Sequence, residues 1–139
     1  MRENKALGLI LTGDTGEGLG ELCHTRTLAS VPFGGRYRII DFMLYNMMYA
    51  GVYDVGVFTK SKYESLMAHV GSGRVWDMAR KNGGLVLLPP NVDNARQAPY
   101  GGELQLLYNY RNFIKEAKAR YVLLCDADII RHINFDEMI

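Results

Sequence analysis

The sequence predicts an α/β fold in which a mainly parallel β-sheet is covered by helices. Four short apolar runs are separated by three segments with helical periodicity, so the expected order is strand, helix, strand, helix, strand, helix, strand. This alternation favours right-handed β-α-β crossovers. Glycine-rich or acidic segments follow two of the apolar runs, which is where open α/β sheets bind ligands. At 139 residues, without internal repeats, the chain is expected to form one domain.

The four expected strands are apolar runs that end at turn-forming or polar residues. Such runs are typical of buried strands. The third run, for example, lies between Gly83-Gly84 and Pro89-Pro90. The expected strands cover residues 6–12, 52–59, 85–88 and 121–125.

The first expected helix covers residues 42–50. Asp41 is predicted to be its N-cap, because a carboxylate can accept hydrogen bonds from the free N–H groups of the first turn. Gly51 is expected to end it. Before this helix, a loop is expected from Gly13 to about Val31, and Pro32 indicates that the irregular structure continues.

Two further helices are expected. The pattern Ser61-x-x-Glu64 predicts a capping box before the second helix, and Gly71 is expected to end that helix. The third is expected to open at Gly101-Gly102, after an exposed loop at residues 91–99. Its apolar face is formed by Leu106, Leu107, Tyr110, Ile114 and Ala117.

Composition and charge narrow the class of protein. The hydrophobic fraction is 48% and the charged fraction 22%, which is ordinary for a globular protein and argues against a disordered chain. The net charge is +1 and the basic residues are scattered, so neither nucleic acid nor a membrane surface is expected as a partner. Cys23 and Cys125 are not in zinc-ligand spacing, and no signal peptide or bilayer-spanning run is seen. A cytoplasmic location with reduced thiols is therefore expected.

Three places could carry chemistry, and each follows an expected strand or opens an expected helix. The first is the loop of residues 13–20. Its Gly16-x-Gly18-x-Gly20 pattern does not have the spacing of a dinucleotide fingerprint, and it lacks the Gly-Lys-Ser/Thr of a P-loop. Asp14 and Glu17 would repel phosphate. From the residues alone, this loop is either a phosphate cradle or an ordinary turn.

The other two places are equally open to a functional and a structural interpretation. Asp128 follows a strand, where a carboxylate could hold Mg²⁺ against a nucleotide phosphate, but Asp126 and Asp128 could also only solvate the strand end. Gly101-Gly102 could admit a base or phosphate at a helix N-terminus, or serve as a flexible helix start. The three histidines are isolated in the sequence, and no catalytic role is assigned to them.

A longer match lies at residues 31–42, which read VPFGGRYRIIDF. This segment closely resembles the VPFGG-x-YR-x-IDF segment of ADP-glucose pyrophosphorylases (glucose-1-phosphate adenylyltransferases). The resemblance extends along the chain. Residues 9–22 resemble the family's glycine-rich loop, Tyr100–Glu103 lie where the family has its second glycine motif, and residues 123–135 resemble its strand ending in Gly-Asp-His.

The resemblance implies a Rossmann-like nucleotidyltransferase domain, a three-layer sandwich, followed by a left-handed β-helix domain. Residues 1–139 would be the truncated N-terminal part of the first domain. The implied reaction is attack of glucose 1-phosphate on the α-phosphorus of ATP, with Mg²⁺, giving ADP-glucose and pyrophosphate for glycogen synthesis. Asp128 would be the candidate metal ligand. The implied nucleotide-binding positions are Thr12, Gly13, Asp14, Thr15, Gly16, Gly102 and Glu103.

The chain also departs from the family pattern. Gly18 stands where the family loop has an arginine, Leu28 stands where it has a lysine, and Asp14 adds an acid to the loop. Ala127 and Ile129 replace the family's Gly and His beside Asp128. Each lost charge-stabilising contact typically lowers the rate ~10²–10³-fold.

This pattern resembles the D-type subunit of two-subunit bacterial enzymes. It predicts a regulatory or weakly catalytic paralogue that assembles with a catalytic subunit. Two alternatives remain: an active enzyme in which Arg26 or Arg36 replaces the lost cations, or a module that senses ATP or a sugar phosphate without chemistry.

Overall fold

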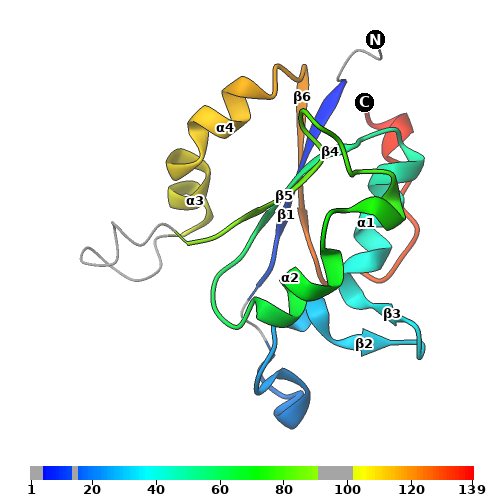
Figure 1. Cartoon of the computed structure of the whole chain (residues 1–139), viewed down its shortest axis with the longest axis vertical. Coiled ribbons are helices and arrows are strands. Elements are labelled where there is room, and N and C mark those ends of the chain that lie inside the picture. The colour runs from blue at the N-terminus through cyan, green and yellow to red at the C-terminus, as the bar shows by residue number, and fades with distance from the viewer. Residues whose placement is uncertain (1–4, 14–15, 91–101) are drawn as a thin grey trace.

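The computed structural model describes residues 5–13, 16–90 and 102–139. Its centre is a four-stranded, fully parallel sheet with the strand order β5-β4-β1-β6 (Figure 1). The α/β fold with a parallel sheet is thereby confirmed. The strands are β1 (Ala6–Leu11), β4 (Asp54–Phe58), β5 (Leu85–Leu88) and β6 (Tyr121–Asp126).

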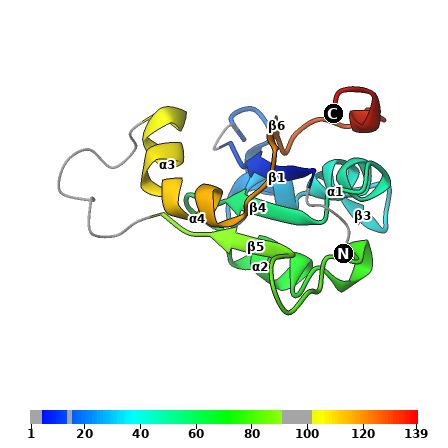
Figure 2. The ribbon, with the colours of Figure 1, turned by 90° about the horizontal axis from the view of Figure 1, so that it is seen from above.

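Helices cover both faces of the sheet, which makes three layers (Figure 2). One face carries α1 (Ile39–Tyr49) and α2 (Glu64–Val70). The other carries α3 (Glu103–Asn109) and α4 (Arg111–Glu116). Short 3₁₀ turns lie at Gly20–Cys23, Leu28–Ser30, Arg74–Trp76 and Phe135–Glu137, and a small hairpin pairs β2 (Pro32–Phe33) with β3 (Tyr37–Arg38).

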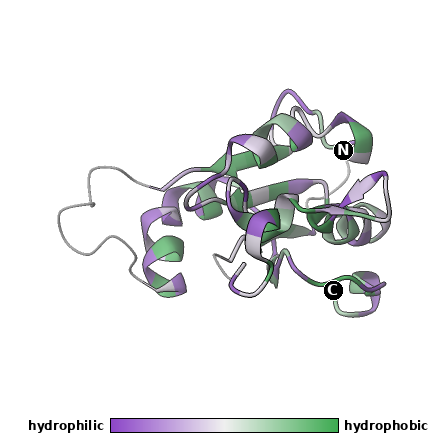
Figure 3. Cartoon of the chain, turned by 90° about the horizontal axis from the view of Figure 1, so that it is seen from below, coloured by the Kyte–Doolittle hydropathy of each residue, from purple (hydrophilic) through white to green (hydrophobic). Residues whose placement is uncertain are grey.

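Alternating side chains of the strands build one core on each face, and Figure 3 shows the central strands mostly as hydrophobic. On the α1 and α2 face, fully buried side chains include Ile10, Val57, Ile40, Met43, Met47 and Leu66. On the α3 and α4 face, the buried strand residues are Leu7, Leu9, Leu11, Phe58 and Leu88. Gly8 lets α1 approach β1 closely, because a Cβ there would lie 2.5 Å from the sulfur of Met47.

Strand β6 forms one edge of the sheet, and its side chains are covered less than those of β1. Tyr121, Val122 and Leu124 are each more than 40% exposed. Register places Val122 and Leu124 beside Leu7 and Leu9, so they share the face that carries α3 and α4. Those two helices pack on the apolar side chains of β1, β4 and β5 instead.

Both predicted N-terminal caps are wrong, whereas Gly51 and Gly71 lie at the helix ends as expected. Helix α1 begins at Ile39, ahead of Asp41, because the Asp41 carboxylate accepts the backbone N–H of Arg38 at 3.0 Å from within the first turn. Helix α2 begins at Glu64 itself, and Tyr63 before it makes no capping hydrogen bond through its side chain. Lys62, with φ +54°, turns the chain sharply at that point.

Two other expectations also need correction. The single helix expected after Gly102 is two short helices, separated at Tyr110, where ψ is 17°. Pro32 pairs with Arg38 in the β2–β3 hairpin, where irregular structure was expected. The loop expected at residues 91–99 lies outside the described residues, as do Asp14, Thr15 and Gly101.

Candidate functional site at the carboxyl edge of the sheet

The strand ends at this edge are tied together by side-chain hydroxyls. The hydroxyl of Thr12 donates to the carbonyl of Phe58 at 2.6 Å, and that of Thr59 donates to the carbonyl of Leu88 at 3.3 Å. Both threonines are buried. The hydrogen bonds between neighbouring strands therefore continue one residue past the ends of β1 and β4. As a result, the loops after these two strands begin at fixed positions.

A small pocket, here called the edge pocket, opens directly above these strand ends. Three of the predicted binding residues, Thr12, Gly13 and Glu103, line it together. Lys60 and Asp126 also line it, so two carboxylates and one ammonium group face the same space. Gly102 precedes the pocket as the exposed N-cap residue of α3. Gly13 of the first glycine segment and Glu103, directly after the second, thus line one pocket.

A larger pocket, here called the loop pocket, lies beside the edge pocket. The glycine-rich loop and the turn after β4 form its walls. Gly16 packs so tightly on Cys23 that a Cβ at position 16 would lie 2.4 Å from the Cβ of Cys23. The lining residues are Gly16, Glu17, Gly18, Gly20, Cys23, His24, Arg26, Thr27, Leu28, Ser61 and Lys62.

Among the described residues, one arginine and one lysine line the loop pocket, and the lysine, Lys62, was not predicted from the sequence. Arg26 and Lys62 both lie on its wall. The Lys62 ammonium donates to the carbonyl of Cys23 at 3.1 Å, which joins the turn after β4 to the loop. The signal in the sequence that could have identified Lys62 is its position as a basic residue shortly after the second expected strand. Arg36, by contrast, lies exposed in the turn between β2 and β3 and is not part of this wall.

Gly18 and Leu28 line the same pocket, so the two positions at which the resemblance leads us to expect cations share one space. At Gly18 the backbone has φ +97°, a conformation that side-chain-bearing residues rarely adopt. No atom would lie within 4 Å of a Cβ added there. A larger residue at position 18 is therefore opposed by backbone strain and not by lack of space.

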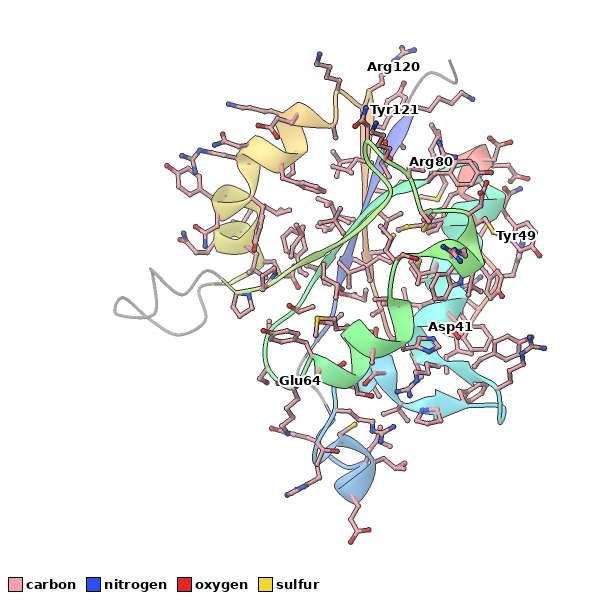
Figure 4. All side chains as sticks on the ribbon, in the orientation of Figure 1. Asp41, Tyr49, Glu64, Arg80, Arg120 and Tyr121 are labelled. Carbon is pink, nitrogen blue, oxygen red and sulfur yellow. The ribbon has the colours of Figure 1, made fainter. Side chains whose placement is uncertain are left out.

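Behind the loop pocket, hydrogen bonds hold the supporting elements together. Arg38 donates through Nη1 to the carbonyl of Ser30 at 2.7 Å and to the hydroxyl of Ser65 at 2.8 Å. Asp41, only 4% exposed, pairs with Nε2 of His69 at 2.6 Å. These contacts join α1, α2 and the turn after Leu28, and Figure 4 shows Asp41 near α2. Sequence reasoning treated His69 as isolated, since its partner is 28 residues away.

The metal prediction concerns the end of β6, where Asp126 and Asp128 are both exposed. Among the described residues, no three His, Cys, Asp or Glu side chains gather closely enough to form a metal cage on their own. Mg²⁺ usually binds through one or two carboxylates together with substrate phosphates and water. The donor chemistry of this pair fits such an ion. Asp126 faces the edge pocket, whereas Asp128 is not among its lining residues.

Two groups near the edge have shifted pKa values. Burial, and secondly the Asp126 carboxylate, raise the pKa of the Cys125 thiol to about 11. Burial also raises the pKa of Tyr110, whose hydroxyl donates to the carbonyl of Pro89. Since the thiolate is the nucleophilic form, Cys125 is not suited to nucleophilic catalysis at neutral pH. Within the described ranges, no helix has the length and apolar character to cross a membrane.

Comparison with known proteins adds family context to this geometry. A family model described as nucleotidyl transferase matches residues 7–139. A glucose-1-phosphate adenylyltransferase of Thermotoga maritima is 38% identical over 133 residues, which cover 96% of this chain and 31% of that protein. A glucose-1-phosphate adenylyltransferase of Clostridium acetobutylicum is 37% identical over 139 residues, which cover 100% of this chain and 37% of that protein. The chain therefore spans about a third of these relatives.

A solved structure supports the fold independently. It comes from Bacillus anthracis, is described as a glucose-1-phosphate thymidylyltransferase in complex with sucrose, and superposes with a TM-score of 0.71. The match covers 96% of this chain and 48% of that structure. At 20% sequence identity, the match shows a common fold and nothing more about substrates.

Proposed function

The chain belongs to the nucleotidyl transferase family, and on that premise we propose that it is part of a glucose-1-phosphate adenylyltransferase of glycogen synthesis. Within that enzyme it is a regulatory or weakly catalytic subunit. The implied reaction joins glucose 1-phosphate and ATP to give ADP-glucose and pyrophosphate. The names of the relatives support the substrates.

One observation carries the regulatory role. Gly18 and Leu28, which stand where the resembled family has an arginine and a lysine, line the same loop pocket. Phosphoryl and nucleotidyl transfer depend mainly on positioning and on neutralising charge in the transition state. A pocket that has lost two cations together should stabilise a departing pyrophosphate poorly.

The edge pocket adds to this electrostatic argument. Among the described lining residues, Asp126 and Glu103 place two carboxylates in it against one ammonium group, that of Lys60. A polyanionic nucleotide gains less in such a pocket than in one lined by neutral or basic groups. If Asp128, with Asp126 beside it, held Mg²⁺, the ion would supply positive charge that offsets part of this repulsion. The chain's own residues otherwise supply the fixed rim formed by Thr12, Gly13 and the start of α3.

The full-length protein, assayed alone for ADP-glucose formation, tests this proposal. Turnover comparable to that of a catalytic subunit would overturn the regulatory role. The expected role also requires association with a catalytic ADP-glucose pyrophosphorylase subunit. Co-purification of the two full-length proteins tests that association separately from turnover.

A second candidate function is binding of a nucleotide or sugar phosphate without chemistry. Arg26 and Lys62 favour it, because both cations line the loop pocket whose other cations are missing. Isothermal titration with ATP, ADP-glucose and glucose 1-phosphate distinguishes the two roles. A heat of binding with any of the three ligands supports a sensing subunit. If none of the three gives a heat of binding, only a structural role is left.

A further inference from the structure

Asn46 of α1 holds the chain segment that follows Asp128. Its side chain is buried, with the residue only 4% exposed. Through Nδ2 it donates to the carbonyl of Arg131 at 2.8 Å, and through Oδ1 it accepts the backbone N–H of Ile133 at 3.2 Å. Both ends of one amide are therefore committed to a single segment 85 to 87 residues away in sequence.

That segment carries Asp128, and it is fixed on both sides of this residue. Before it, the backbone N–H of Ala127 donates to the carbonyl of Leu11 at 2.9 Å, and Ala127 is buried. After it, the two Asn46 hydrogen bonds hold residues 131 and 133, and Phe135 packs into the core with 3% exposure. Asp128 itself is exposed. Its position is thus determined by backbone anchors and not by its own burial.

We propose that Asn46 is a positioning residue for the metal-binding carboxylate of Asp128. This proposal rests on the proposed function, since it assumes that Mg²⁺ binds at the end of β6. Asn46 does not touch the ion. It keeps the turn at residues 127–133 in one conformation. The Asp128 carboxylate therefore lies at the carboxyl edge before the ion binds, and binding does not have to offset the conformational entropy of ordering the turn.

Side-chain chemistry explains why an amide is needed at position 46. The segment offers one carbonyl and one N–H, and a carboxamide meets both at once because it donates from its nitrogen and accepts at its oxygen. An aspartate at this position keeps the acceptor for Ile133 but places a second oxygen against the carbonyl of Arg131. A leucine leaves both backbone groups without their partner. In each case the turn loosens, while the sheet beneath it is unchanged.

The test is a titration of the full chain with Mn²⁺ alone, followed by electron paramagnetic resonance. The signal of free Mn²⁺ decreases as the ion binds to the protein. Groups that support metal ligands typically contribute ~10–100-fold in affinity. Because Asn46 acts through the backbone, we expect about fivefold weaker binding in Asn46→Asp. Asn46→Ser serves as a second variant if Asn46→Asp does not fold. Asp128→Asn should abolish the binding that is measured.

Asp54→Ala is the matched control. Asp54 also fixes a backbone group through its side chain, since it accepts the N–H of Gly84 at 2.7 Å, but it lies at the opposite end of β4. This variant should bind Mn²⁺ as the wild type does. Equal binding by wild type and Asn46→Asp would overturn the proposal, and so would an equal loss in Asp54→Ala. Binding that is absent from the wild type or survives in Asp128→Asn would overturn it too. None of these results depends on whether the full-length protein turns over.

Discussion

Two adjacent regions of the chain, residues 16–28 and residues 31–42, differ in what their side chains do. In the second region the hairpin residues 32–37 are exposed, but Val31, Ile40 and Asp41 are buried, and the N–H of Ile39 donates to the carbonyl of Val31 at 3.1 Å. The first region mainly lines the loop pocket, and most of its side chains are exposed. The longest resemblance to the family lies in the region whose second half is largely buried, and the departures at Gly18 and Leu28 lie in the region that lines the loop pocket. Fold and chemistry can therefore change separately here.

The largest effect expected from this difference is on stability. Asp41→Ala removes the acceptor for Arg38 and for His69 and leaves the arginine N–H unpaired, which should lower the free energy of unfolding by about 3 kcal/mol. Glu17→Ala, at an exposed position in the first region, should change it by less than about 0.5 kcal/mol. Urea unfolding of both variants measures this. Equal losses would show that the two regions do not differ in the way described.

The next effect concerns ligand binding. Arg26→Ala combined with Lys62→Ala removes both cations from the loop pocket, and we expect ATP to bind about tenfold more weakly because charge-assisted contacts are lost. Arg36→Ala is the matched control, since Arg36 lies in the hairpin turn. Calorimetric titration with ATP measures all three proteins. If the control weakened binding as much as the double variant, the pocket would not be the phosphate site.

A smaller, opposite effect should follow from restoring the lost cations. Leu28→Lys puts an ammonium group into the loop pocket without backbone strain and should strengthen ATP binding about threefold. Gly18→Arg should gain less, because an arginine at φ +97° costs about 1–2 kcal/mol. The same titration compares the two variants. A larger gain from Gly18→Arg would mean that the loop readily changes conformation.

The smallest effect concerns Cys125, on the edge strand. Its pKa is raised to about 11, so the folded state disfavours the thiolate. The resulting stabilisation is fully present below the unfolded-state pKa of about 8.5 and is lost as the pH rises towards 11. Iodoacetamide should modify Cys125 slowly at pH 8 and faster as the pH approaches 11. Asp126→Asn, which removes the smaller cause, should speed the reaction slightly. Fast modification at pH 7 would contradict the burial of this thiol.

Local sequence patterns were sufficient for the strands and for the layering. Strand β5 was predicted with its observed ends, because glycine and proline pairs bound it closely. The ends of the helices were harder to predict. Asp41 matches an N-cap by residue type, but its partners are the N–H of Arg38 and the ring of His69, and the latter comes from another helix.

The candidate site was predictable where residues lie at strand ends and unpredictable where distant segments meet. Thr12, Gly13 and Glu103 converge on the edge pocket because parallel strands end at one edge. Lys62 was missed, since its approach to Cys23 depends on the positive φ of the turn after β4. Asn46 was missed for a similar reason, because an asparagine inside an apolar helix gives no local sign of a partner 85 residues away. The binding roles themselves remain predictions.

The most direct test of the proposed regulatory role is an assay of ADP-glucose formation by the full-length protein, with and without a catalytic pyrophosphorylase subunit. Alone, it should turn over at least ~10³-fold more slowly than the catalytic subunit, because the proposal holds that two charge-stabilising contacts are missing. Added to the catalytic subunit, it should change the rate or substrate dependence of that subunit. Turnover by the protein alone at the catalytic subunit's rate would contradict the proposed role.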